Sequence, residues 1–249
     1  MRLSNSLFES SGKVRPVKDV PAVIVYVLFF ALFFQITIQI NSSAVNPEIR
    51  PIPEAMSVDK LKLIGLADNI AMSKLTMLWL QAFDDQPGIS IPFKQLNYSR
   101  IINWLNIILE LDNRTLYPLL SASRIYSEVP DDNRKRMMLE FVYEKFLDDP
   151  NRRWPALAHA VYVAKHQLKD LPLALRYAKA LAKYATSKNV PFWAKEMNIY
   201  VLEDMNEIES AKILIGGLIE SGEITDEHEL RFLKERLKRL EKSGQVQGK

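Results

Sequence analysis

The residues of this chain that could do chemistry are three histidines and three pairs of aspartates, and their spacing argues against an active site. His159 and His166 are seven residues apart, so on one helix they share a face about two turns apart. That separation is too long for two ligands of one metal ion, and no carboxylate lies between them. His228 stands among acidic residues at the expected start of a helix, where carboxylates stabilise the helix dipole.

The acidic pairs all fall at expected turns near proline or asparagine: Asp84-Asp85, Asp131-Asp132 and Asp148-Asp149. Acid pairs act as general acid and base when they are buried in a cleft, whereas at the ends of helices they usually serve as caps. The chain has no cysteine, which excludes a thiol nucleophile. It also lacks the glycine-rich and histidine motifs that bind nucleotides or zinc. We therefore expect no enzyme, no cofactor and no metal site.

One apolar stretch dominates the N-terminal part of the chain. Pro21 to Ile40 contains twenty residues without a charge, long enough for one helix through a bilayer core, and no second such stretch follows. A cleaved signal peptide is the main alternative because residues 42–44 are small, but the apolar core of a signal peptide is shorter. We predict a retained transmembrane helix over residues 20–41; a buried helix of a soluble core is the third possibility.

The basic residues near this stretch predict its orientation. Four of them precede it (Arg2, Lys13, Arg15 and Lys18), and only Arg50 follows closely. Because basic residues stay on the cytoplasmic side, we predict that residues 1–19 are cytoplasmic and that the body lies outside. The absence of cysteine agrees with an oxidising compartment. The expected location is a bacterial inner membrane, single-pass, with a periplasmic C-terminal body.

Two amides lie within the expected transmembrane helix. Gln35 and Gln39 share one of its faces, and amide side chains in a bilayer prefer a hydrogen-bond partner on another helix. We predict that they pack the anchor against a partner. The alternative is that they sit near the outer interface, where water is available.

The charge of the remaining chain excludes a general attraction to nucleic acid. Four of the 33 basic and two of the 30 acidic residues lie within residues 1–40, which leaves a net charge near +1 on the rest. The basic runs at 134–136 and 231–242 are interspersed with acidic residues, a pattern typical of a solvated helix face. A site for anionic lipid or a protein partner is the alternative, and no small-molecule substrate is evident.

Apolar residues recur every three to four positions through the rest of the chain and predict an all-α body over residues 57–242. A proline-bearing linker at 42–56 precedes it and a flexible tail at 243–249 follows it. Ser57 is the expected N-cap of a first helix, whose apolar stripe runs from Leu61 to Ala82. Further helices are expected at 98–111, 116–128, 133–147, 154–169, 173–185, 192–204, 208–221 and 226–242. Turns of two to five residues indicate antiparallel hairpins, and the only short β-like piece is Ile89–Ile91.

The hairpins also show a period. Aromatic residues recur at Trp79, Tyr117, Trp154 and Trp193, and Ala174 and Ala211 lie at matching places in the second helices. The intervals of 37 to 39 residues, with two helices per unit, are the signature of a helical solenoid.

These residues resemble the tetratricopeptide repeat superfamily, in which an early aromatic is followed by Leu and a small residue. Trp154, Leu157 and Ala158 match this pattern, as do Tyr117, Leu120 and Ser121. The match covers about residues 115–222 and is degenerate, since Met197 replaces the small residue and the period exceeds 34. The resemblance implies a solenoid of hairpins packed through Tyr117, Trp154, Ala158, Ala174, Trp193 and Ala211. A non-repetitive helical bundle is the alternative.

Solenoids of this kind bind proteins without any reactive group. We therefore expect a membrane-anchored periplasmic scaffold, assembly factor or accessory subunit of a cell-envelope complex, with other proteins as partners. The alternatives are a translocon-associated periplasmic chaperone and an envelope hydrolase.

Overall fold

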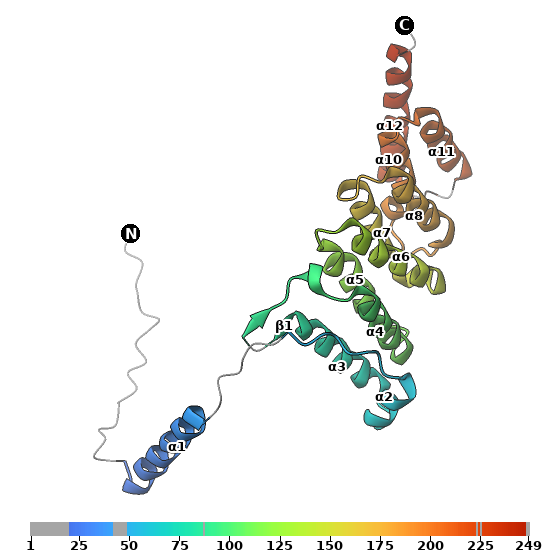
Figure 1. Ribbon diagram of the computed structural model, residues 1–249. Coiled ribbons are helices and arrows are strands. Elements are labelled where there is room, and N and C mark those ends of the chain that lie inside the picture. Colours follow the sequence, from blue (N-terminus) through green and yellow to red (C-terminus); the bar gives the residue numbers. More distant parts are fainter. Residues whose placement is uncertain (1–19, 42–48, 87, 223, 225, 248–249) are drawn as a thin grey trace, which may run out of the picture. The chain divides into compact units, whose positions relative to one another are not determined.

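The computed structural model describes residues 20–41, 49–86, 88–222, 224 and 226–247 (Figure 1). The chain divides into two compact units, Met1–Glu48 and Ile49–Lys249. About 75% of the protein is helical, in twelve α-helices among the described residues, so the predicted all-α class is confirmed.

The first unit contains helix α1 (Ala22–Asn41). Residues 22–40 are all exposed, and mean hydropathy within Ala22–Ile40 reaches 2.3. The helix is long and apolar enough to cross a bilayer, as a signal sequence near an N-terminus also is. The four basic residues used to predict its orientation, and the small residues 42–44, lie outside the described residues.

The second unit begins at Ile49, earlier than the predicted end of the linker at residue 56. Ile52 is buried, and its carbonyl accepts a hydrogen bond from Arg100 Nη1 at 2.5 Å. The carbonyl of Pro53 accepts one from Trp104 Nε1 at 3.1 Å. Residues 49–56 therefore belong to the folded body, because the Ile52 side chain is buried and both carbonyls accept hydrogen bonds from side chains of helix α4 (Tyr98–Leu111).

The stripe from Leu61 to Ala82 does not form one helix. Helix α2 (Val58–Ile64) begins after Ser57 as predicted, but it ends at Gly65, and α3 (Asn69–Gln81) starts in a new direction. The Asp68 carboxylate caps α3 by accepting from Ala71 N at 2.9 Å. A Cβ at Gly65 would lie 3.0 Å from that of Met72, so the close approach of the two helices requires glycine there.

A small hairpin separates α3 from α4. After the 3₁₀ turn η2 (Ala82–Asp84), strand β1 (Asp85–Gln86) pairs antiparallel with β2 (Ile89–Ser90). The predicted piece at 89–91 thus has a partner strand that the alternation pattern did not indicate. A second 3₁₀ turn, η3 (Phe93–Gln95), leads into α4, whose bounds are as predicted.

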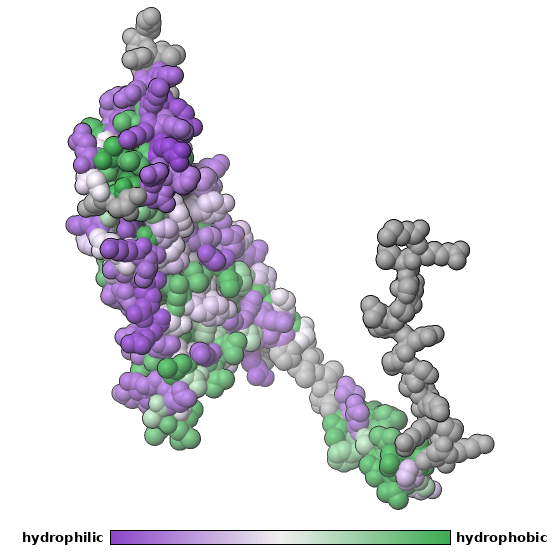
Figure 2. Space-filling view, turned by 180° about the vertical axis from the view of Figure 1, so that it is seen from behind, coloured by the Kyte–Doolittle hydropathy of each residue, from purple (hydrophilic) through white to green (hydrophobic). Residues whose placement is uncertain are grey.

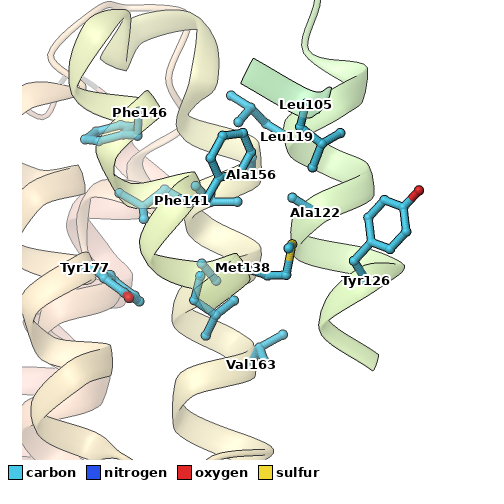
Figure 3. Close-up of a cluster of buried hydrophobic side chains, with 14 of the residues drawn as sticks. Leu105, Leu119, Ala122, Tyr126, Met138, Phe141, Phe146, Ala156, Val163 and Tyr177 are labelled. Carbon is cyan, nitrogen blue, oxygen red and sulfur yellow. The ribbon is translucent and has the colours of Figure 1, made fainter. Parts of the chain in front are cut away.

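The central helices pack in chain order. They are α5 (Tyr117–Arg124), the 3₁₀ turn η4 (Tyr126–Glu128), α6 (Asp132–Asp148), α7 (Pro150–His166) and α8 (Leu171–Tyr184). Each α-helix contacts the next, and α5 also contacts α7. Their shared core includes Met138, Phe141 and Phe146 of α6 between α5 and the pair α7–α8 (Figure 3).

The C-terminal helices have a hydrophobic cluster of their own. They are α9 (Phe192–Lys195), α10 (Met197–Asp204), α11 (Ile208–Ser221) and α12 (Glu227–Gln247). The predicted single helix at 192–204 is broken at Glu196, and α12 continues through residues 243–247 of the predicted tail. Ile199, Leu202, Ile215 and Leu233 are among the buried residues of this second cluster.

Two glycines inside α11 offer a simple stability test. Close helix packing does not require Gly216 or Gly217, since no described atom outside their own stretch of helix lies within 4 Å of a Cβ built on either. Replacing either by alanine should therefore raise the free energy of unfolding by about 0.5–1 kcal/mol. Denaturant unfolding measures this, with Gly222→Ala as the contrasting control. Gly222 ends the helix at φ 68°, so alanine there should destabilise.

Candidate interaction surface

The histidines lie on α7 and α12, and the buried Nε2 of His159 has no hydrogen-bond partner among the described residues. His159 and His166 sit on α7, and the Tyr162 ring lies between them, with ring centroids 5.7 and 4.8 Å away. Burial, followed by the nearby Arg124, lowers the pKa of His159. His228 lies in the first turn of α12, whose start is capped by Asp226. Within the described part of the chain, no three histidine, aspartate or glutamate residues cluster as metal ligands would.

The aspartate pairs lie at the ends of elements. Asp131 caps α6 by accepting from Arg134 N at 2.9 Å. Asp148 and Asp149 end α6 and form ion pairs with Arg153 and Arg152, at 3.1 and 3.2 Å. Asp84 and Asp85 lie at the turn from η2 into β1.

A buried carboxyl group that the sequence did not indicate lies at the break between α9 and α10. Glu196 is 2% exposed, and its carboxyl group faces that of Glu229, with no basic side chain among the described residues hydrogen-bonded to it. Its neighbours are Glu229 and Arg236 of α12 and Tyr200 of α10. Burial and the Glu229 carboxyl raise the pKa of Glu196 to about 8. None of the hollows described below is lined by Glu196.

The alanines assigned to repeat packing are all buried: Ala158, Ala174 and Ala211. The aromatic residues assigned to repeat packing are less buried. Tyr117 and Trp193 are about half exposed, and Trp154 is partly buried, with its ring edge-to-face against Trp193 at 5.5 Å.

The dipeptides Tyr117-Pro118 and Trp154-Pro155 do not occupy equivalent places. Tyr117 opens α5, whereas Pro155 lies inside α7, which already begins at Pro150. Pro118 therefore stands in the first turn of its helix, whereas Pro155 does not. Gln35 and Gln39 are both exposed on α1, within the first unit.

Exposed apolar side chains gather on α2, on α3 and in the turn between them. They belong to Leu63, Ile64, Leu66, Ile70, Leu75, Leu78 and Trp79. Most belong to the stripe that the sequence shows between Leu61 and Ala82, but they face outward. Figure 2 shows hydrophobic side chains gathered at this end of the body. We call these seven residues the α2–α3 apolar surface.

Two apolar hollows flank α3. One, of about 480 Å³, is lined by Leu61 and Ile64 of α2, Met72, Leu75 and Trp79 of α3, and Trp104 of α4, among others. The other, of about 330 Å³, is lined by Met77 and Leu78 of α3, Ile108 of α4, and Tyr117 and Pro118 of α5, with three more residues. The α2–α3 apolar surface is thus a ridge with a depression on each side.

A third hollow, on the other side of α2, is polar and has a volume of about 590 Å³. Its basic residues are Lys62 of α2, Arg114, Lys145 of α6, and Arg152 and Arg153 of α7; its acidic residues are Glu110, Asp148 and Asp149. Arg153 is buried and donates to the carbonyls of Lys145 and Asn113 at 2.6 and 3.2 Å. Lys62, Arg114, Lys145 and Glu110 form no salt bridge with any described residue, and basic residues outnumber acidic ones in the lining, so the hollow has an excess of positive charge.

No protein-family model matches the chain, and no curated protein or solved structure matches it significantly.

Proposed function

We propose that the protein is a single-pass protein of a bacterial inner membrane whose periplasmic body binds other proteins, as a scaffold, assembly factor or accessory subunit of a membrane complex. The α1 helix is the retained anchor, and the excess of basic residues before it supports a cytoplasmic N-terminus. The body works by binding and not by catalysis.

The order of the central helices supports a solenoid of the tetratricopeptide type. Each of α5 to α8 packs against the next, α5 also packs against α7, and α8 packs against α10. Buried alanines at the helix contacts (Ala158, Ala174 and Ala211) allow the close approach that such hairpins need. The departures at Pro155 and Glu196 make the repeat irregular.

The observation that carries the proposal is the apolar outer face of α3. A terminal helix of a soluble solenoid needs a polar outer face, whereas Leu75 and Leu78 are each more than 60% exposed. Exposed contiguous apolar surface of this kind marks an interaction site. A partner helix with apolar residues three and four positions apart would place those side chains in the two hollows beside α3.

The anchor determines what kind of protein can reach this surface. As the proposed anchor, α1 keeps the whole protein at a membrane, where other membrane proteins are its available partners. The occupant that we propose is an apolar helix of another membrane protein.

Site-specific photo-crosslinking in cells tests this. A photoreactive residue at Leu75 or Leu78 of the full chain should give a covalent adduct with one other membrane protein. The matched control is Ile213, an equally exposed apolar residue on α11, which should not give that adduct. Adducts at Leu75 and Leu78 with lipid or with a second copy of this chain alone would overturn the proposal.

The identified partner allows a quantitative check with purified full-length proteins. Leu75→Asp and Leu78→Asp should each weaken binding at least tenfold, because buried apolar anchors at interfaces are worth more than about 1.4 kcal/mol. Ile213→Asp should leave affinity unchanged. Equal affinity of all three variants would place the interface elsewhere.

A further inference from the structure

We infer that the bend between α2 and α3 is a second membrane contact, which dips into the bilayer interface among anionic lipid headgroups. This inference rests on the retained anchor of the proposed function. It concerns a different part of the surface, the residues at the bend, and a different partner, the lipid.

The bend presents apolar side chains to solvent. Leu63 is 78% exposed at the end of α2, Leu66 is 90% exposed in the turn, and Ile70 is 56% exposed at the start of α3. Three large apolar side chains that meet solvent at one turn are costly in water and favourable at a lipid interface.

The backbone at the bend has an uncommon conformation. Leu66 and Ala67 adopt left-handed conformations, with φ of 48° and 71°, which non-glycine residues seldom adopt. A residue in such a conformation costs free energy, and it stays there only where the surrounding structure holds it, often at a binding site. Here the close contact of Gly65 with Met72 and the Asp68 cap fix the turn.

Composition points to lipid as the occupant. The helix α2 and the helical segment Asn69–Asp84 meet at a bend of 107° and together have the apolar composition of a membrane segment, although one face of them is buried in the body. The bend is also close to the anchor along the chain, because α2 begins nine residues after the body does.

The charged residues near the bend indicate that the lipid is anionic and not neutral. Lys60 and Lys62 flank the bend on α2 and Lys74 follows it on α3, against Asp59 and the cap residue Asp68. Lys62 also lines the polar hollow, where Arg114 and Lys145 form no salt bridge with any residue of the described chain. An apolar tip beside lysine and arginine side chains is the pattern of an interfacial membrane contact, since the cations meet lipid phosphates.

The absence of cysteine permits a direct test on the full chain in lipid vesicles. A single nitroxide label is placed at Leu66→Cys, and its collisions with oxygen, which partitions into lipid, are compared with collisions with a water-soluble nickel chelate. We expect the label at residue 66 to meet oxygen more than nickel. A label at Ile213→Cys, which is 73% exposed on α11, should show the reverse.

Lipid composition and dilution complete the test. Lys62→Glu on the labelled chain should make residue 66 more accessible to nickel in vesicles that contain phosphatidylglycerol, but not in vesicles of phosphatidylcholine alone. A membrane contact persists when lipid is added in excess, whereas shielding by a second copy is lost on dilution. Equal nickel access at residues 66 and 213, or shielding lost on dilution, would overturn the inference. The purified vesicles contain no partner protein, so this outcome is independent of the crosslinking result at Leu75.

Discussion

Replacing Tyr177 by alanine is expected to lower the free energy of unfolding by about 3–5 kcal/mol. Tyr177 on α8 is fully buried, and its ring stacks on Tyr143 of α6 with centroids 5.2 Å apart. Its hydroxyl donates to Glu140 at 3.2 Å, and the same carboxylate pairs with Arg176. The substitution would open a cavity between α6 and α8 and remove a ring that lies 5.1 Å from the Arg176 guanidinium.

Denaturant unfolding of the full chain in mild detergent, followed by circular dichroism, measures this loss. Tyr177→Phe keeps the ring and removes only the hydroxyl, so it should cost about 1 kcal/mol. Tyr162→Ala, at a tyrosine that is half exposed on α7, should cost less than about 1 kcal/mol. A similar small loss for Tyr177→Ala and Tyr162→Ala would show that the contact between α6 and α8 is not part of a packed core.

Replacing Glu196 by glutamine is expected to stabilise the protein, by an amount on the order of a few kcal/mol, at pH 8 and above. Burial and Glu229 raise the pKa of Glu196 from 4.5 to about 8, so the folded state keeps a proton that the unfolded chain has lost between these values. The stability of the natural protein therefore falls as the pH rises from about 4.5 to about 8, and then levels off. Glutamine has the same shape and no charge, so the variant escapes this fall.

Unfolding curves recorded between about pH 4.5 and pH 9 test the effect. The two proteins should be equally stable at the acidic end and diverge as the pH rises. Glu229→Gln should move the interval to lower pH, because it removes the neighbouring carboxylate. Glu220→Gln, at an exposed residue of α11, controls for the loss of one charge. A constant difference between the natural protein and Glu196→Gln at all pH values would contradict the assignment.

The sequence predicted the helices whose apolar period agrees with their caps. The helix α4 follows the cap residue Asn97 and α11 ends at Gly222, so both have the expected bounds. It also predicted the cap at Asp131. In these elements the local signal and the tertiary packing favour the same structure.

The bend between α2 and α3 could not be predicted, because an apolar stripe does not reveal which face of a helix is buried. Ile64, Ile70, Leu75 and Leu78 continue the helical period, so the pattern favours one helix. Gly65 and the cap residue Asp68 mark the break, but glycine and aspartate also occur at many positions where no helix ends. The candidate interaction surface was therefore in the sequence as a core pattern, and only the structure shows that it faces solvent.

Glu196 could not be predicted for a similar reason. The surrounding residues continue a helical pattern from Phe192 to Asp204, and a glutamate in such a pattern is usually exposed. Its burial depends on α12, which begins some thirty residues later at Glu227. The residues near Glu196 in sequence therefore do not indicate that it is buried.

The separation of the body into two hydrophobic clusters has a consequence for cooperativity. Leu175 packs against both clusters, and Lys165 of α7 pairs with Asp204 of α10, but most contacts of α11 and α12 stay within the second cluster. Amide hydrogens of α11 and α12 should therefore exchange with deuterium through partial openings that leave α4 to α8 closed. We therefore expect α11 and α12 to be the first helices of the body that proteases cut, and α4 to α8 to keep their protection.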